Sequence, residues 1–174
     1  AKSIGNIVAP EEVIEKYGRD VLRYYLLSSP PWDDFYFKWA DVDAAAKSFV
    51  VIENAFNFIN SYGKKSKAGK LKPEDKWLLS RLNSLIESST QNCKSYNMHK
   101  AANEINGFIV NDLSRWYIKL IRDRVWPTYK GKDKAAAFYV LYESLSVATK
   151  LMAPVTPFLA EHGHQIARSL GESK

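Results

Sequence analysis

Residues 39–62 read WADVDAAAKSFVVIENAFNFINSY, and their apolar positions repeat with the period of a helix. The apolar side chains recur at steps of three and four residues: Val42, Ala45, Phe49, Ile52, Phe56 and Ile59. Such steps place side chains on one face of an α-helix, so this stretch predicts an amphipathic helix that buries the face. Asp41 is a candidate N-cap and Gly63 a candidate stop signal.

Four more helices are expected after this one, near residues 73–96, 97–126, 133–152 and 156–169, and prolines and glycines separate them. The expected inward positions of the first three are Trp77, Leu78, Leu82, Leu85, Ser89 and Cys93, then Ala101, Ile105, Phe108, Leu113, Trp116 and Leu120, then Ala136, Tyr139, Tyr142, Leu145 and Thr149. Gly107 predicts a kink or a close helix crossing. Because each helix can bury its stripe only against the others, the sequence predicts an all-α fold, an antiparallel helix bundle.

The first 38 residues follow a different pattern, and we predict a domain boundary between residues 1–38 and the bundle of residues 39–174. Two short helices are expected at residues 10–17 and 19–28, split by Gly18, and a strand-like run follows at residues 35–37. A segment of this size cannot hold a core of its own. It is expected to dock on the bundle or on a partner outside this chain.

The composition excludes several classes of protein. A hydrophobic content of 46% in 174 residues is enough for a packed core, so global disorder is excluded. No run approaches the roughly 18 to 20 uncharged apolar residues that span a bilayer. The single cysteine, Cys93, excludes an internal disulfide framework and a zinc site built on paired cysteines. These features favour a cytoplasmic, reducing compartment.

Most of the net charge of +6 lies in one segment, residues 63–73. This segment contains no acidic residue, and its lysines are Lys64, Lys65, Lys67, Lys70 and Lys72. Glycines, a proline and the absence of apolar periodicity indicate a loop. The loop is either a solvated connector or an electrostatic binding patch, and composition alone favours the connector.

Motifs for an independent active site are missing. The sequence has no Gly-x-Gly, hence no Rossmann fingerprint or P-loop, and no Gly-x-Ser-x-Gly elbow. His162 and His164 are two residues apart, which points them to different faces of a helix, so no metal site is expected. We predict exposed or capping roles for these two and for His99. The sequence therefore favours binding over catalysis.

A basic ridge is predicted on the helix at residues 97–126. Arg115, Lys119 and Arg122 recur at i, i+4 and i+7, and Arg124 and Trp126 follow near the end of the helix. Arginine can pair with phosphate and stack on bases, and aromatic rings can take unstacked bases of single-stranded RNA. The alternative is a solvated face on which Asp112 and Asp123 pair with these cations.

Three stretches resemble class I aminoacyl-tRNA synthetases, and the resemblance covers essentially the whole chain. Residues 1–6, AKSIGN, are similar to the end of the KMSKS signature, and the spacing of residues 10–26 resembles the passage from that signature into the stem-contact helices. Residues 114–124 and 153–161 resemble the anticodon-binding helix bundle of the isoleucine, valine, leucine and methionine subclass. Residues 114–126 look most like isoleucyl-tRNA synthetases of the archaeal and eukaryotic type.

The resemblance implies that this chain is a carboxy-terminal portion of an isoleucine-tRNA ligase that uses ATP and Mg²⁺. Lys2 and Ser3 match signature residues that act on ATP in the family, but they are expected to be inactive here. The chain itself is expected to have no cofactor and no catalytic activity. Its expected partners are a tRNA, with tRNA(Ile) favoured, and the catalytic and editing domains of the same polypeptide.

The resemblance also assigns candidate residues for binding the anticodon stem and loop: Arg115, Lys119, Arg122, Arg124, Trp126, Lys64, Lys65 and Lys67. Two alternatives remain. One is the corresponding domain of a valine, leucine or methionine ligase, and the other is a helical scaffold that binds a protein through Trp32, Phe35, Tyr36 and Trp39. Residues 161–164, EHGH, depart from the family pattern, which puts the regularity of the last helix in doubt.

Overall fold

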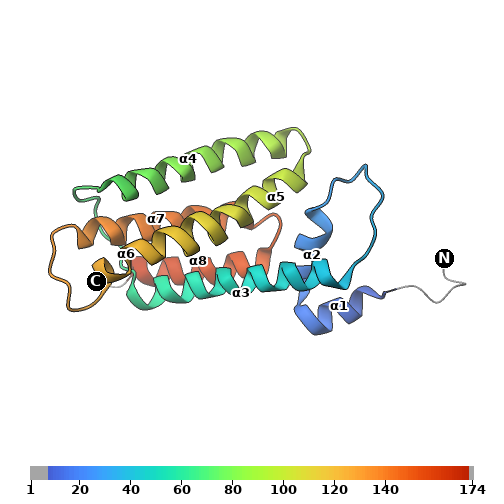
Figure 1. Cartoon of the computed structure of the whole chain (residues 1–174), viewed down its shortest axis with the longest axis horizontal. Coiled ribbons are helices and arrows are strands. Elements are labelled where there is room, and N and C mark those ends of the chain that lie inside the picture. Colours follow the sequence, from blue (N-terminus) through green and yellow to red (C-terminus); the bar gives the residue numbers. More distant parts are fainter. Residues whose placement is uncertain (1–7, 173–174) are drawn as a thin grey trace, which may run out of the picture.

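The chain folds as an antiparallel bundle of long helices with two short helices at one end (Figure 1). This computed structural model describes residues 8–172. The elements are α1 (Pro10–Tyr17), α2 (Arg19–Leu27), α3 (Trp39–Tyr62), α4 (Pro73–Lys94), α5 (Met98–Gly107), η2 (Phe108–Ile118), α6 (Lys119–Val125), α7 (Lys134–Met152) and α8 (Pro157–Glu172). The predicted all-α bundle is confirmed. The strand-like run at residues 35–37 was a wrong prediction, because it forms an irregular connection before α3.

Helix α3 confirms the stripe predicted for it, since all six of its predicted core residues are buried. A fully buried side chain of this kind contributes roughly 1.5 to 3 kcal/mol. The helix begins at Trp39, and Lys38 is its N-cap. Asp41 therefore lies in the first turn instead of capping the helix, and there its charge favours the positive end of the helix dipole.

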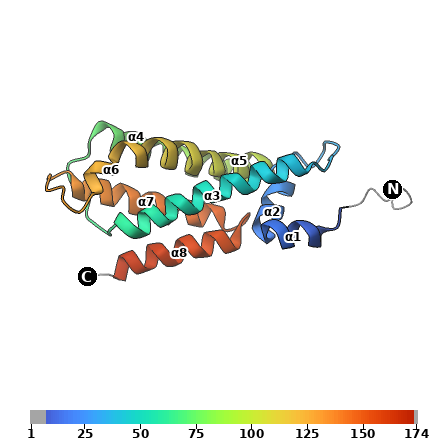
Figure 2. The ribbon, with the colours of Figure 1, turned by 60° about the horizontal axis from the view of Figure 1, so that its bottom comes forward.

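Helix α7 packs against α3, α4, α5, α6 and α8, so it lies in the interior of the bundle (Figure 2). Val140, Leu141 and Leu145 are fully buried on it, and Ala136 and Ala148 let neighbouring helices approach closely. The predicted inward residues Tyr139 and Tyr142 are only partly buried. The other three predicted residues, Ala136, Leu145 and Thr149, are buried. The buried face of α7 is therefore wider than predicted, because neighbouring helices cover two sides of it.

The rod formed by α5, η2 and α6 contains an 11-residue π-helical stretch, Phe108–Ile118. A π-helix bonds i to i+5, so each turn takes about one more residue than an α-turn. The buried positions therefore become Tyr117 and Ile121, both 0% exposed. The prediction that Trp116 and Leu120 face the core is wrong: they are 41% and 55% exposed. Trp77 and Cys93, also predicted to face the core, lie exposed on α4.

Helix α8 is regular through residues 161–164, contrary to the doubt raised by the sequence. Gly163 lies where α8 meets Phe56 and Thr149: a Cβ built there would be 2.5 Å from Thr149 Cγ2. The close helix crossing that the sequence suggested for Gly107 is found at Gly163. At Gly107 a Cβ would meet nothing within 4 Å, and the α-helix passes into the π-helix there.

The short helices α1 and α2 dock on the bundle through an apolar face and one buried carboxylate. Val13, Val21 and Tyr25 join the common core. The Asp20 carboxylate accepts a hydrogen bond of 2.7 Å from the Leu159 amide in the first turn of α8. Burial raises the pKa of Asp20, although backbone hydrogen bonds from α8 oppose the shift. The two helices are thus part of one packed body, and the domain boundary after residue 38 stays a prediction.

Candidate nucleic-acid interface

Two connections meet at the end of the bundle that lies away from α1 and α2 (Figures 1 and 2). One is the lysine-rich connection between α3 and α4, and the other joins α6 to α7. Lys72 Nζ on the first lies 2.7 Å from Asp133 Oδ2 on the second. We call this region, residues 62–75 and 124–134, the distal end.

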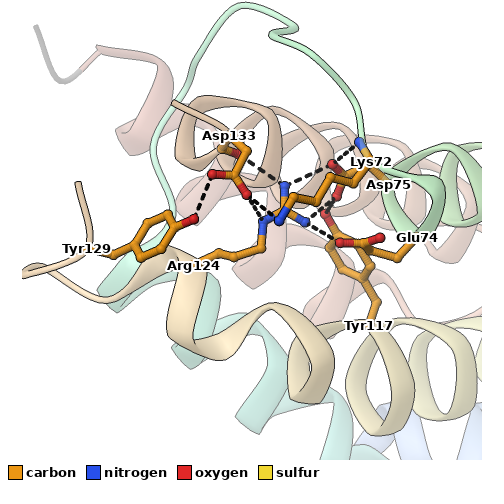
Figure 3. Close-up of polar contacts among 7 residues, drawn as sticks. All are labelled: Lys72, Glu74, Asp75, Tyr117, Arg124, Tyr129 and Asp133. Carbon is orange, nitrogen blue, oxygen red and sulfur yellow. Dashed lines mark hydrogen bonds and ion pairs between the residues drawn. The ribbon is translucent and has the colours of Figure 1, made fainter. Parts of the chain in front are cut away.

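Arg124 lies inside the distal end and is only 7% exposed (Figure 3). Its guanidinium is bidentate on Asp75, with Nη1–Oδ1 at 3.0 Å and Nη2–Oδ2 at 2.9 Å. Nη1 also lies 2.9 Å from Glu74 Oε1, and Nε lies 3.0 Å from Asp133 Oδ2. The expectation that Arg124 offers its charge to tRNA therefore needs correction, because three carboxylates already surround this charge in the interior.

Asp75 and Tyr117 complete the buried part of this cluster. The Tyr117 hydroxyl donates to Asp75 Oδ1 at 2.7 Å, and the Lys72 amide donates to Asp75 Oδ2 at 2.9 Å. Burial alone would raise the pKa of Asp75, but the hydrogen bonds from Arg124, Tyr117 and Lys72 outweigh it and lower the pKa. Burial and the neighbouring carboxylate raise the pKa of Tyr117, so its hydroxyl remains a donor. The cluster joins α4, η2 and α6.

Asp133 extends the cluster to the start of α7. Tyr129 donates its hydroxyl hydrogen to Asp133 Oδ1 at 2.7 Å, and the ammonium of Lys72 lies on Oδ2. The hydrogen bonds from Lys72 and Tyr129 lower the pKa of Asp133 to about 2. Glu74, Asp75 and Asp133 are thus all paired within the cluster.

The exposed charge of the distal end is consequently positive. Lys64, Lys65 and Lys67 are exposed in the first connection, and Lys130 and Lys132 in the second. The acids at this end are paired within the cluster, so they offer little competition to these lysines for an anionic ligand. Lys65 also lies over the ring of Tyr142, with 5.6 Å from Nζ to the ring centroid.

Trp126 lies at the end of α6 and is 44% exposed. Its ring stacks on Tyr62 at the end of α3, with ring centroids 5.4 Å apart and an interplanar angle of 25°. Tyr62 in turn packs on Phe58 at 5.0 Å. The distal end therefore combines exposed cations with an aromatic ring supported by a second one. Such a ring can accept an unstacked base.

The three cations of the predicted ridge, Arg115, Lys119 and Arg122, are all exposed. Arg115 Nη1 donates to Asn111 Oδ1 on the same helix at 3.2 Å. Asp112, which the solvated-face interpretation paired with these cations, instead binds Arg81 of α4 at 3.0 Å. The three cations of the predicted ridge therefore lie exposed on the rod, whose last helix ends just before Trp126.

The remaining predicted groups lie elsewhere. Trp32, Phe35 and Tyr36 are exposed in the connection between α2 and α3, at the opposite end from Trp126. His99 is buried against Trp32, with ring centroids 5.2 Å apart, contrary to the exposed or capping role predicted for it. Lys2 and Ser3 lie outside the described residues.

Within residues 8–172 no group of three or more histidine, cysteine or acidic side chains could hold a metal ion. Among the helices of residues 8–172, none combines the length and the apolar character of a transmembrane span.

Sequence reasoning missed the buried cluster that orders the distal end. Its residues come from four separate stretches of the chain, at positions 72–75, 117, 124 and 129–133, so spacing within one helix could not bring them together. One signal was available: Arg124 stands three residues after Ile121, on the buried side of the same helix. A charge on an apolar stripe indicates a buried ionic partner.

Together, the antiparallel bundle and its basic, aromatic end define a helical binding module. The family model for the anticodon-binding domain of tRNA ligase matches residues 75–174, and the model for class I tRNA synthetases (I, L, M and V) matches residues 1–38. The chain belongs to the anticodon-binding domain family of tRNA ligases. The resemblance to class I synthetases stated above is therefore confirmed.

Individual relatives agree with this assignment. Isoleucine--tRNA ligase of Methanothrix thermoacetophila is 42% identical over 99% of this chain and 18% of its own length. That of Methanopyrus kandleri is 41% identical over 92% of this chain and 16% of its own length. Mycobacterium tuberculosis methionyl-tRNA synthetase in complex with methionyl-adenylate shares the fold, with a TM-score of 0.73 and 25% identity over 99% of this chain and 35% of that one. The chain thus spans less than a fifth of the length of these two isoleucine-tRNA ligases.

Proposed function

We propose that this chain binds the anticodon stem and loop of tRNA(Ile) through its distal end, as part of an isoleucine-tRNA ligase. The observation that carries the proposal is the exposed ring of Trp126, which stacks on Tyr62. Exposed lysines lie in the two connections beside it, and the acidic side chains of the distal end are paired within the buried cluster. The names of the relatives support isoleucine over valine, leucine or methionine.

The proposal gives different tasks to the two kinds of residue. Trp126 stacks on an unpaired base of the loop, because the exposed face of its ring can release water and contact the face of a nucleobase. Lys64, Lys65 and Lys67 bind phosphates of the loop, and Arg115, Lys119 and Arg122 follow the phosphates of the stem. Phosphate contacts orient the RNA, whereas base contacts discriminate between sequences. Arg124 has no direct contact in this proposal.

The parent enzyme is proposed to attach isoleucine to its tRNA at the expense of ATP with Mg²⁺, in the cytoplasm. Lys2 and Ser3, which match the signature that acts on ATP, would belong to that distant reaction. The cluster of acids in the distal end is occupied by Arg124 and Lys72, so this chain has no free carboxylate group there for Mg²⁺.

Binding to purified tRNAs that differ only in the anticodon tests the proposal. We expect the isoleucine anticodon to bind most tightly, and the affinity to fall steeply with salt because phosphates are contacted. Replacing Lys64, Lys65 and Lys67 by glutamine should weaken all tRNAs alike and reduce the salt slope by about one for each lysine on a phosphate.

The matched control is Trp32→Ala, which removes an exposed aromatic ring at the opposite end of the bundle. It should leave RNA affinity unchanged, whereas Trp126→Ala should lower it. If the chain bound no tRNA at low salt, and Arg122→Glu left tRNA charging by the full-length enzyme unchanged, the proposal would be overturned. Loss of salt-independent protein binding on Trp32→Ala would support the scaffold alternative.

A further inference from the structure

One lysine holds the backbone of the turn that carries Trp126. Lys134 Nζ lies 2.7 Å from the carbonyl oxygen of Trp126, 3.3 Å from that of Tyr129 and 3.4 Å from that of Pro127. An ammonium has three donors and no acceptor. All three donors of Lys134 thus face backbone carbonyls of one turn. Lys130 and Lys132 of the same connection are exposed.

The carbonyls of Trp126, Pro127 and Tyr129 lie just beyond the end of α6. Pro127 ends the helix after Val125, and the last carbonyls of a helix have no amide within the helix to bind. A lysine near a helix carboxyl end can satisfy such carbonyls and also favours the negative end of the helix dipole. The Tyr129 amide donates to the Trp126 carbonyl at 3.0 Å and closes the turn. The backbone of Trp126 is therefore fixed by two donors.

The backbone of Lys134 is itself held in place. Lys134 is the first residue of α7 and follows Asp133, which the buried cluster fixes. Arg124 Nη2 donates to the Asp133 carbonyl at 3.0 Å, and Tyr129 binds the Asp133 carboxylate. The buried cluster and Lys134 form one continuous set of contacts that ends at the carbonyl of Trp126 (Figure 3 shows its buried part).

We propose that Lys134 is a positioning residue: it holds Trp126 stacked on Tyr62 and thereby prepares the ring for an RNA base. The inference rests on the proposed function, since it needs Trp126 to contact RNA. Fixing a side chain before binding removes the entropy cost of ordering it on binding. Lys134 thus acts through Trp126 and contacts no phosphate itself.

A double-mutant cycle on the 174-residue chain tests this role, with an anticodon stem-loop RNA as the probe. Trp126→Ala should weaken binding by between about 5-fold and 150-fold, the range for losing a stacked base. Lys134→Met keeps the length of the side chain and removes its donors. It should weaken binding by between about twofold and tenfold, the range for one ordered side chain.

The combination of the two substitutions decides the mechanism. If Lys134 acts through Trp126, the double variant binds like Trp126→Ala alone, because coupled residues are not additive. Lys132→Met is the matched control: it removes one exposed charge from the same connection, and its effect should multiply with that of Trp126→Ala. If the losses of Lys134→Met and Trp126→Ala also multiplied, Lys134 would act by charge alone and the inference would be overturned.

A second measurement needs no RNA. In the chain labelled with fluorinated tryptophan, the resonance of Trp126 is identified among the five tryptophans by its loss in Trp126→Phe. Lys134→Met should shift or broaden this resonance and leave the unfolding midpoint close to that of Lys132→Met. An unmoved resonance would overturn the inference while leaving the proposed function intact. Equal RNA binding by the wild type and Trp126→Ala would instead overturn the role of Trp126 in the proposed function, whatever the fluorine spectra show.

Discussion

The guanidinium of Arg124 is bidentate on the carboxylate of Asp75, which joins the last turn of α6 to the first turn of α4 across 49 residues of sequence. Both side chains are buried. Removing two charges from water is costly, and the pair recovers this cost only while every oxygen and nitrogen keeps a partner. The pair is therefore a point at which one substitution has a large effect.

Arg124→Met should lower the free energy of unfolding by about 3 to 5 kcal/mol, because it leaves Asp75 charged, buried and without its cation. Urea unfolding monitored by circular dichroism gives this value. Arg122→Met, two residues earlier on the same helix and exposed, is the matched control and should change stability by less than about 0.5 kcal/mol. Similar small losses for both variants would show that the Arg124–Asp75 pair does not hold these helices together.

Asp133 makes the stability of the distal end depend on pH. Its pKa is lowered from 3.8 to about 2 by Lys72 and Tyr129, so its contribution to stability is fully present above about pH 4 and is lost as the pH falls through about 2. The gap in unfolding free energy between wild type and Asp133→Asn should therefore be large at pH 6 and smaller at pH 2. Urea midpoints at both pH values measure the gap.

Asp123→Asn, at an exposed position in α6, controls for the loss of one negative charge. Its gap from the wild type should change less with pH than that of Asp133→Asn. A gap for Asp133→Asn that stayed constant from pH 6 to pH 2 would contradict the ion pairs drawn for this residue.

Two glycines in helices should respond to alanine in opposite directions. Gly163→Ala places a methyl group against Thr149 and Phe56 and should cost about 1 to 3 kcal/mol. Gly107→Ala meets open space at a helical backbone (φ −59°), so it should stabilise the chain by up to about 1 kcal/mol. Thermal unfolding of the two variants checks both signs, and a stabilising Gly163→Ala would contradict the close crossing of α8 on α3.

Much of this fold follows from local signals in the sequence. Pro73 begins α4, Pro127 follows the end of α6 and Pro157 begins α8, as a ring without an amide hydrogen requires. The period of the apolar stripe on α3 predicted six core residues, and all six are buried. These features depend on neighbours within one helix, which the sequence states directly.

The parts that escaped prediction depend on contacts between distant residues. The position of the Arg124 side chain is fixed by Asp75 on α4 and by Asp133, the N-cap residue of α7. In the site, an aromatic ring at position 126 could be identified as a candidate, but its support by Tyr62 required the ends of α3 and α6 to be side by side. The roles of Lys64, Lys65 and Lys67 remain proposals, because a lysine-rich connection is equally able to be solvated.

The π-helical stretch offers the sharpest test of the difference between sequence period and structure. An α-helix continued from Leu113 would bury position 120, whereas the π-turns bury position 121. Ile121→Ala should therefore cost about 2 to 5 kcal/mol, and Leu120→Ala less than about 0.5 kcal/mol. Urea unfolding of the two variants measures both losses on adjacent residues of similar size. If Leu120→Ala were the more damaging substitution, the rod would have α-helical register throughout and Trp116 would return to the core.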